Sequence, residues 1–188
     1  MRTEEKWNNQ FRKKCLAKFT PRIARDLEMI DVPSDLQTGE CQSTFIYGDI
    51  ESGKTIRASF MMLQEMKHLY LQGDISGKAE SIIFVSFPDL FAEIRETFDN
   101  PKKHESEVME KYLNAYLLVL DDFLTIRPTE WVMEILYRLI NHRYEYMKKT
   151  IITSNLSLEE LEIKLNDQRI TSRINRMCVL EFKKRSNF

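Results

Sequence analysis

The chain has 188 residues, enough for one α/β domain with a substantial buried core. Apolar residues make up 43% and charged residues 30% of it, and no apolar run reaches the length of a membrane span, so we expect no membrane anchor. The net charge of −1 argues against a protein that coats nucleic acid along its whole surface, although it is compatible with local basic patches. Cys15, Cys41 and Cys178 are odd in number and lack pairing or metal spacing, which predicts free thiols and a cytoplasmic protein.

The first forty residues differ in character from the rest. Residues 2–18 could form a helix with a basic side, and they fit a partly ordered lead-in as well as a helix that docks on a partner. A second helix is expected from Pro21 to about Ile30, with Thr20 as its N-cap, followed by a linker at residues 33–39. We therefore expect an N-terminal helical segment and linker at residues 1–40, with possible partner docking, and a main domain at residues 41–188.

The main domain alternates short apolar runs with helical segments. The clearest helix runs from Thr129 to about Lys148 and carries one apolar stripe. Each apolar run is nearly continuous, which is typical of parallel strands that are covered on both faces. The pattern predicts a doubly wound α/β sheet. Its five expected strands are residues 43–47, 81–86, 116–120, 150–154 and 178–182.

A glycine-rich loop follows the first expected strand and opens a helix that should run to about Leu71. Its glycines allow backbone N–H groups to converge on phosphate oxygens, and the positive end of the new helix points at them. Lys54 can reach the outer phosphates, and the Thr55 hydroxyl can ligate Mg²⁺. The loop has the G-x-x-x-x-G-K-[ST] spacing, which predicts a nucleoside triphosphate site formed by Gly48, Asp49, Ile50, Glu51, Ser52, Gly53, Lys54 and Thr55.

Two further strands end in polar residues that suit this chemistry. Asp121 and Asp122 follow an apolar run, and the carboxyl ends of parallel strands lie beside the phosphate loop. Asp121 is expected to hold Mg²⁺, and Asp122 to polarise the attacking water. Asn155 follows the next strand and could orient that water, although an asparagine there is by itself only a turn residue.

In combination, these motifs resemble the DnaC/IstB group of AAA+ ATPases over roughly residues 43–182. The resemblance rests on Asp121-Asp122-Phe123, on Thr129-Glu130-Trp131 opening a helix, on the run from Thr150 to Ser157, and on the run from Asp167 to Ile174. Members of that group load the hexameric replicative helicase onto DNA or assist transposases.

The resemblance implies a P-loop NTPase of the AAA+ type, a three-layer sandwich with a five-stranded, mostly parallel sheet and a minimal or absent helical lid. It also implies ATP and Mg²⁺ as cofactors, with slow hydrolysis that assembly or DNA stimulates. Asn155 matches the sensor-1 position. Arg173 matches the arginine finger that reaches a neighbouring subunit's γ-phosphate, with Arg169 as a second candidate, and this implies an ATP-dependent oligomer. From spacing alone, both arginines could be surface charges on a short helix.

The resemblance also points to single-stranded DNA contacts. Related proteins place them near the end of the helix after the second strand and near the start of the helix after the carboxylates, which correspond here to Phe98, Thr129 and Trp131. Lys102, Lys103 and Arg127 are the candidates for phosphate contacts. Phe98 and Trp131 could instead be core residues. One departure from the family is Glu51, which stands where the family has another glycine in the loop.

The leading hypothesis is therefore an ATPase that loads a replicative helicase onto single-stranded DNA. Its alternatives are a transposition helper of the IstB kind and a nucleotide-gated scaffold with negligible turnover. A small-molecule kinase is disfavoured, because no lid or substrate-binding arginines have an evident place in the sequence.

Overall fold

The computed structural model describes residues 9–29, 43–73, 78, 80–100 and 102–183. The helices are α1 (Asn9–Leu16), α2 (Pro21–Glu28), α3 (Lys54–Leu71), α4 (Phe87–Arg95), α5 (Glu105–Asn114), α6 (Glu130–Glu145), α7 (Leu158–Leu165) and α8 (Gln168–Ile174). The strands are β1 (Thr44–Gly48), β2 (Ile82–Ser86), β3 (Leu117–Asp121), β4 (Lys149–Ser154) and β5 (Cys178–Phe182).

The five strands form one sheet in the order β2-β3-β4-β1-β5, and all four pairings are parallel. Every residue of β3 is buried, as expected for a central strand with helices on both faces. The carboxyl ends of the strands therefore meet at one edge of the sheet, where ligands bind in open α/β folds.

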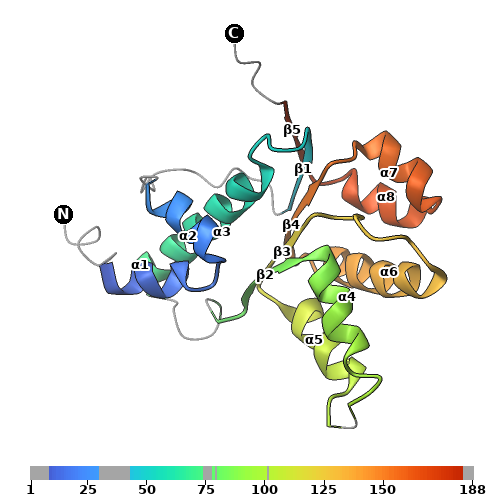
Figure 1. The fold of residues 1–188 in the computed structure, drawn as a ribbon, viewed down its shortest axis with the longest axis horizontal. Coiled ribbons are helices and arrows are strands. Elements are labelled where there is room, and N and C mark those ends of the chain that lie inside the picture. Colours follow the sequence, from blue (N-terminus) through green and yellow to red (C-terminus); the bar gives the residue numbers. More distant parts are fainter. Residues whose placement is uncertain (1–8, 30–42, 74–77, 79, 101, 184–188) are drawn as a thin grey trace.

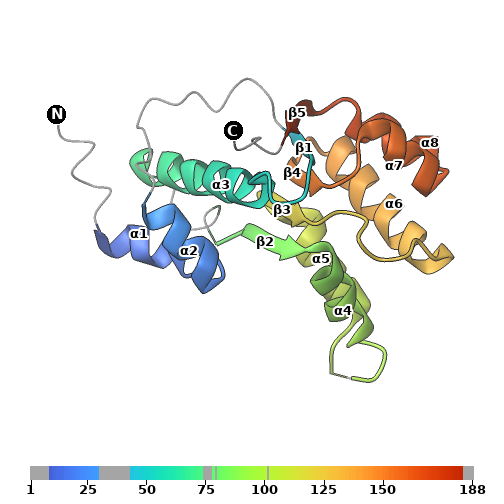
Figure 2. The same cartoon turned by 45° about the horizontal axis from the view of Figure 1, so that its top comes forward.

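Helices cover both faces of the sheet, as Figure 1 shows with the sheet seen nearly edge-on. Helices α1, α2 and α3 lie on one face and form a core with the sheet that includes Leu27, Ile46 and Leu63. Helices α4 to α8 lie on the other face, around a second core that includes Phe87, Leu118 and Leu136. In Figure 2 the pair α4–α5 extends away from the sheet as a helical hairpin.

The predicted α/β fold is confirmed, and the five expected strands appear within one or two residues of their expected ends. Thr20 occupies the N-cap position of α2, as expected, but its side chain makes no capping hydrogen bond. The expectation that its hydroxyl caps the helix is therefore wrong. The expected linker at residues 33–39 lies outside the described residues. Among the described helices, none is long and apolar enough to cross a membrane.

The cysteines differ from the expectation of free thiols. Cys15 is a buried free thiol, as expected. Cys178, at the start of β5, is disulfide-bonded, so the expectation is wrong for this residue. Sequence spacing does not reveal such a bond, because it depends on how close two side chains come in the folded chain.

Candidate nucleotide site

The glycine loop connects β1 to α3, and two of its glycines have different reasons to be there. Gly48 has a φ of 136°, and a Cβ atom on it would lie 1.9 Å from the carbonyl oxygen of Phe182 on β5. The Asp49 N–H donates to this same oxygen at 3.0 Å. Gly53 has a φ of 93° with nothing within 4 Å of its Cβ position, so backbone conformation alone favours glycine there.

Polar groups of the loop converge where phosphates would lie. Lys54 is 7% exposed, and its ammonium donates to the carbonyls of Gly48 and Asp49 at 2.9 and 2.5 Å. Burial lowers the pKa of Lys54, while the charges of Asp122, Asp49 and Asp121 oppose this. The Ser52 hydroxyl is buried and has no hydrogen-bond partner among the described residues. An unpaired hydroxyl, an ammonium group and the N-terminus of the 18-residue helix α3 together fit phosphoryl oxygens.

The Asp121 carboxylate lies beside the first turn of α3. The Thr55 hydroxyl lies 3.1 Å from both of its oxygens, and the Thr153 hydroxyl on β4 donates to Oδ1 at 2.5 Å. Burial raises the pKa of Asp121, while the Thr153 hydrogen bond acts in the opposite direction. Hydroxyl and carboxylate oxygens are ligands that suit Mg²⁺, which usually binds through one or two carboxylates and substrate phosphates.

The turn after β3 is fixed by β4. Asp122 is exposed and has a φ of 55°, in the left-handed region. Its N–H donates to the Thr153 hydroxyl at 3.1 Å, and the Phe123 N–H donates to the Thr153 carbonyl at 2.8 Å. Thr153 thus orients both acidic residues, a role that the sequence reasoning missed. Asn155 is exposed and directly follows Ser154, the last residue of β4.

The two candidate finger arginines lie elsewhere. Arg169 is in α8, where its side chain pairs with Asp167 at 2.7 Å. Arg173, in the last turn of α8, lines a pocket together with Ser43, Lys148 and residues at the start of β4 and β5. These are the amino-terminal ends of the parallel strands, whereas Thr55 and Asp121 lie at the carboxyl ends. The structure therefore does not bring either arginine to the glycine loop of its own chain.

The aromatic candidates for DNA contact come together where the turn after α4 meets the first turn of α6. The Phe98 and Trp131 rings lie 5.6 Å apart, with Phe98 60% exposed and Trp131 partly buried. The Arg95 guanidinium lies 5.3 Å from the centre of the Trp131 ring. Sequence reasoning missed Arg95, although it precedes Phe98 by one helical turn. The result is an aromatic and cationic cluster whose exposed ring is Phe98.

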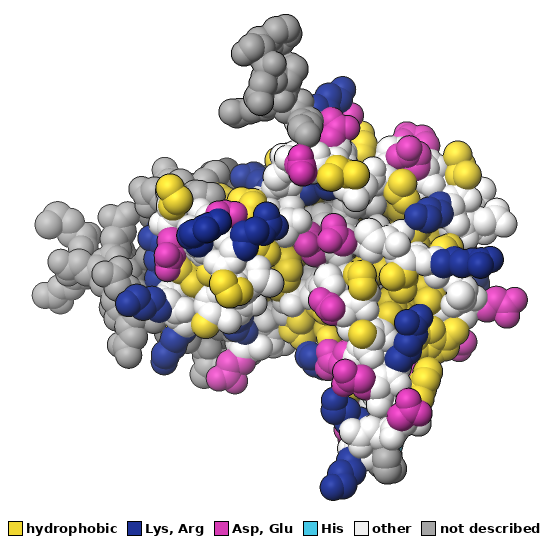
Figure 3. Space-filling model, in the orientation of Figure 1, with side chains coloured by type: hydrophobic (Ala, Val, Ile, Leu, Met, Phe, Trp, Pro, Cys, Tyr) yellow, Lys and Arg dark blue, Asp and Glu magenta, His cyan; other side chains and the backbone are white. Residues whose placement is uncertain are grey.

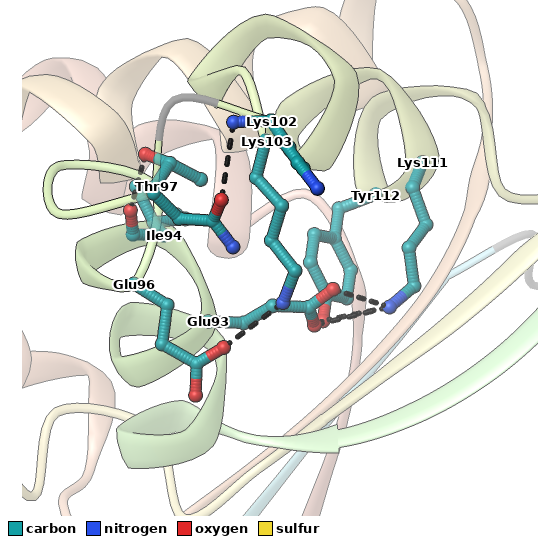
Figure 4. Close-up of polar contacts among 9 residues, drawn as sticks. Glu93, Ile94, Glu96, Thr97, Lys102, Lys103, Lys111 and Tyr112 are labelled. Carbon is teal, nitrogen blue, oxygen red and sulfur yellow. Dashed lines mark hydrogen bonds and ion pairs between the residues drawn. The ribbon is translucent and has the colours of Figure 1, made fainter.

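The polar DNA candidates have separate local roles. Lys103 forms an ion pair with Glu96 at 3.1 Å, while Lys102 is exposed at the turn of the α4–α5 hairpin, as the close-up in Figure 4 shows. Basic side chains also appear at this end of the molecule in the space-filling view of Figure 3. The Thr129 hydroxyl caps α6 by accepting from the Val132 N–H at 3.3 Å, and Arg127 is exposed.

The chain is similar in sequence to known replication initiator proteins. DnaA, the chromosomal replication initiator protein of Lacticaseibacillus casei (strain BL23), is 27% identical over 132 residues, which are 70% of this chain and 27% of that protein. The chain spans about a quarter of the length of the curated relatives it matches.

Solved structures share the fold. The DnaC helicase loader has a TM-score of 0.58 and 22% identity over 94% of this chain and 100% of that chain. The replication initiator DnaA bound to AMPPCP and single-stranded DNA has a TM-score of 0.59 and 19% identity, over 95% of this chain and 47% of that chain. These likenesses show that the chain and the solved structures share one α/β fold.

The family model described as IstB-like ATP binding protein matches residues 40–179, a segment that contains the glycine loop, both carboxylates and Asn155. This segment is well over half of the chain. The chain therefore belongs to the family of IstB-like ATP-binding proteins.

Proposed function

We propose that this protein hydrolyses ATP to load a hexameric replicative helicase onto single-stranded DNA, working as an ATP-dependent oligomer. Two similar proteins support the proposal. The solved DnaC helicase loader shares the fold over its entire chain, and a DnaA structure that shares the fold over 47% of its chain is bound to AMPPCP and single-stranded DNA.

In this proposal the chain's own residues bind and orient the reactants. The glycine loop and Lys54 hold the phosphates, and Thr55 with Asp121 holds Mg²⁺, which neutralises charge on the phosphates. Asp122 polarises the attacking water, and Asn155 orients it. The positive φ of Asp122 fits this role, because strained backbone is common at functional sites.

The observation that carries the proposal is a chain of aromatic contacts between the acidic turn and the exposed cluster. Phe123, next to Asp122, contacts Phe87 at 5.1 Å, and Phe87 contacts Phe91 at 4.9 Å. Phe91 lies 5.6 Å from Trp131, which in turn contacts Phe98. In our proposal, a nucleotide-dependent shift of the acidic turn is passed to the DNA surface through these packed rings, which are the physical contacts between the two sites.

The loading step can be tested with purified replicative helicase, ATP and a circular single-stranded DNA. We expect the wild-type chain to increase the amount of helicase retained on the circle. Lys54→Ala should abolish this effect and nucleotide binding together, because it removes the ammonium that faces the phosphates. Asp122→Asn should keep ATP binding but lower turnover at least about 100-fold. Helicase loading that is unaffected by Lys54→Ala would contradict the proposal.

DNA binding is tested separately with a fluorescent oligonucleotide at several salt concentrations in Mg-ATP. Phe98→Ala should weaken binding about tenfold with little change of salt slope, because base stacking contributes roughly 1–3 kcal/mol per base. Lys102→Ala should reduce the salt slope by about one, because it removes one phosphate contact. No binding at low salt would exclude the proposed DNA surface.

A transposition helper is the second candidate, favoured by the IstB-like family match. It predicts that a transposase, and not the helicase, binds the ATP-loaded chain when both purified partners compete. A nucleotide-gated scaffold would instead show full partner binding in Asp122→Asn with no loss of function.

A further inference from the structure

The outer edge of β2 lies along a groove. β2 is at one end of the sheet order, with β3 as its neighbour, and in Figure 1 it lies between helices α1 and α2 on one side and the α4–α5 hairpin on the other. The groove has a volume of about 600 Å³, which is within the size range of ligand sites. Residues 83–86 of β2 line it, and it reaches Thr55, Asp121 and Asp122.

The hydrogen bonds of the sheet show which backbone groups of β2 face outward. The Tyr116 N–H donates to the carbonyl of Ser81, the residue before β2, at 2.9 Å, so this carbonyl faces β3. Alternate residues of a strand direct their N–H and C=O groups to opposite sides. The backbone groups of Ile82, Phe84 and Ser86 therefore point away from β3.

Only part of this edge has a partner within the described residues. The Lys18 ammonium donates to the carbonyls of Ile82 and Glu80 at 3.1 and 3.4 Å. The Phe84 N–H, the Phe84 carbonyl and the Ser86 N–H have no corresponding partner in the described part of the chain. Unpaired groups on an edge strand are a template for pairing with another chain. The pair on Phe84 matches the two hydrogen bonds that directly opposite residues exchange in antiparallel strands.

The two walls of the groove differ in charge. Lys18 and Arg22 line the wall formed by α1 and α2, and Arg22 has no ion pair among the described residues. On the α4–α5 wall, the Glu93 carboxylate is paired with the Lys111 ammonium at 2.8 Å, as Figure 4 shows, which leaves the charge of Asp89 unbalanced. A ligand that fits both walls therefore carries an acidic group on one side and a basic group on the other.

The side chains of β2 show which wall each residue of an added strand would face. Phe84 points toward α1 and α2, where its ring lies 5.7 Å from the ring of Phe19. Val85 points to the opposite face and belongs to the core that α4 and α5 share with the sheet. Opposite residues of an antiparallel pair lie on the same face. The residue opposite Phe84 would thus face the wall with Arg22, and the residue before it would face the wall with Asp89.

We propose that this groove binds an extended segment of a partner protein, which adds to the sheet as an antiparallel strand beside β2 with an acidic side chain toward Arg22 and, one position earlier, a basic side chain toward Asp89. An extended chain supplies N–H and C=O groups at the spacing of this edge, while its alternate side chains provide specificity. The inference goes beyond the proposed function, because it concerns a peptide site and does not require helicase loading. The bound segment would lie beside the nucleotide site, since the same groove reaches Asp121 and Asp122.

A synthetic peptide with this charge pattern tests the groove. The probe is Thr-Val-Lys-Glu-Val-Thr, acetylated and amidated at its ends, titrated into nitrogen-15-labelled protein. It should shift the amide signals of Phe84 and Ser86 and slow the hydrogen exchange of the Phe84 amide. The peptide Thr-Val-Glu-Lys-Val-Thr has the same composition with the two charges exchanged. It should need about five times the concentration for the same shift, because two attractive exposed contacts become repulsive.

Methylation of single peptide nitrogens tests the strand pairing. A methyl group on the glutamate nitrogen of the first peptide removes the N–H that donates to the Phe84 carbonyl, and it should weaken binding at least about tenfold. A methyl group on the lysine nitrogen is the matched control, because this nitrogen faces away from β2, and binding should change by less than about twofold. Equal losses from the two methyl groups would overturn the antiparallel pairing.

Charge reversal in the protein tests the wall that α2 forms. Arg22→Glu should abolish the preference between the two peptides, because each peptide then makes one attractive and one repulsive contact. Arg25→Glu is the matched control, since Arg25 is exposed on the same helix and does not line the groove, and it should keep the wild-type preference. Both variants should keep the wild-type melting temperature, because both side chains are exposed.

The remaining outcomes overturn the inference. Equal binding of the two peptides to the wild-type chain, or shifts confined to amides remote from β2, would show that the groove does not recognise an extended segment. A dimer that Arg22→Glu dissociates would show that a second copy occupies the groove. Shifts of the Phe84 and Ser86 amides by an oligonucleotide and not by the peptide would assign the groove to nucleic acid. The peptide experiments contain no helicase, so this inference and the proposed loading function can fail independently.

Discussion

At the residue scale, the glycine loop shows that the same sequence motif can have more than one physical cause. Gly48 is required by the approach of the Phe182 carbonyl, and Gly53 only by its left-handed backbone. Glu51 also has a positive φ, of 64°, at the place where the resembled family has a third glycine. A left-handed conformation costs a non-glycine residue about 1–2 kcal/mol, which a folded domain can tolerate.

Gly48→Ala should lower the free energy of unfolding by about 3 kcal/mol, because its Cβ atom would overlap backbone atoms of β5 that cannot move freely. Gly53→Ala is the matched control and should cost only about 1 kcal/mol, since nothing lies within 4 Å of the added atom. Urea unfolding of both variants without nucleotide gives the comparison. Equal losses would show that the contact with β5 is unimportant.

Asp121 gives a pH dependence of stability. Burial raises its pKa above the ordinary 3.8, so the folded state holds this proton more tightly than the unfolded state does. The contribution of this group to stability is thus present in full at low pH and is lost as the pH rises through the raised pKa. Asp121→Asn should therefore be more stable than wild type at pH 7, with a difference that shrinks as the pH approaches 3.8. Urea unfolding at several pH values checks this, and a less stable variant at pH 7 would contradict it.

At the scale of elements, Arg143 of α6 connects three parts of the fold. Its guanidinium is 2% exposed and donates to the carbonyls of Tyr112 and Ala115 at the end of α5, at 2.7 and 3.1 Å. It also donates to the Lys149 carbonyl and the Thr150 hydroxyl at the start of β4, at 2.5 and 2.9 Å. Burial lowers the pKa of Arg143 to about 9, which still leaves the group charged at neutral pH. One side chain thereby satisfies carbonyls that the C-terminus of α5 leaves open.

Arg143→Met should lower the free energy of unfolding by about 3 kcal/mol or more, because several buried acceptors lose their donor. Arg143→Lys should recover part of the loss, since an ammonium group can donate to some of these acceptors but lacks the planar fork. Thermal unfolding of the two variants measures the difference. A methionine variant as stable as wild type would mean that water replaces the guanidinium.

At the scale of the whole molecule, the N-terminal helices belong to the same packed body as the sheet. Leu27 of α2 is fully buried in the core that α3 shares with the sheet. The Lys18 ammonium, between α1 and α2, donates to the Ile82 carbonyl on the edge strand β2 at 3.1 Å. We propose that residues 1–40 dock on a partner and that residues 41–188 form the ATPase core. Because α1 and α2 pack against α3, partner binding at these helices would act directly on the position of α3.

Leu27→Ala should lower the free energy of unfolding of the whole protein by about 3 kcal/mol, the usual range for a buried leucine. Met29→Ala, at a side chain that is 85% exposed, should change it by less than about 0.5 kcal/mol. Each variant should unfold in a single cooperative urea transition, from which its free energy of unfolding is measured. If Leu27→Ala affects only a separate, early transition, the N-terminal helices fold as an independent segment.

The sequence alone determined the order of strands and helices and the phosphate loop, because hydrophobic periodicity and turn residues act over a few neighbouring positions. It also placed Asp121, Asp122 and Asn155 at strand ends, where the topology of a parallel sheet brings them to one edge. Thr153 was not predicted, because a threonine within an apolar strand gives no local sign of the carboxylate it will meet.

Only the tertiary structure decided which distant groups meet. Thr55 and Asp121 are 66 positions apart, and their contact depends on the position of α3 beside β3. The contacts of Arg169 and Arg173 with the Tyr137 ring likewise depend on how α8 packs on α6. The burial of α1 and α2 depends on a core that α3 and the sheet supply. Local patterns encode the elements, but contacts between elements depend on packing across the whole molecule, and a single sequence read along its length does not contain those distances.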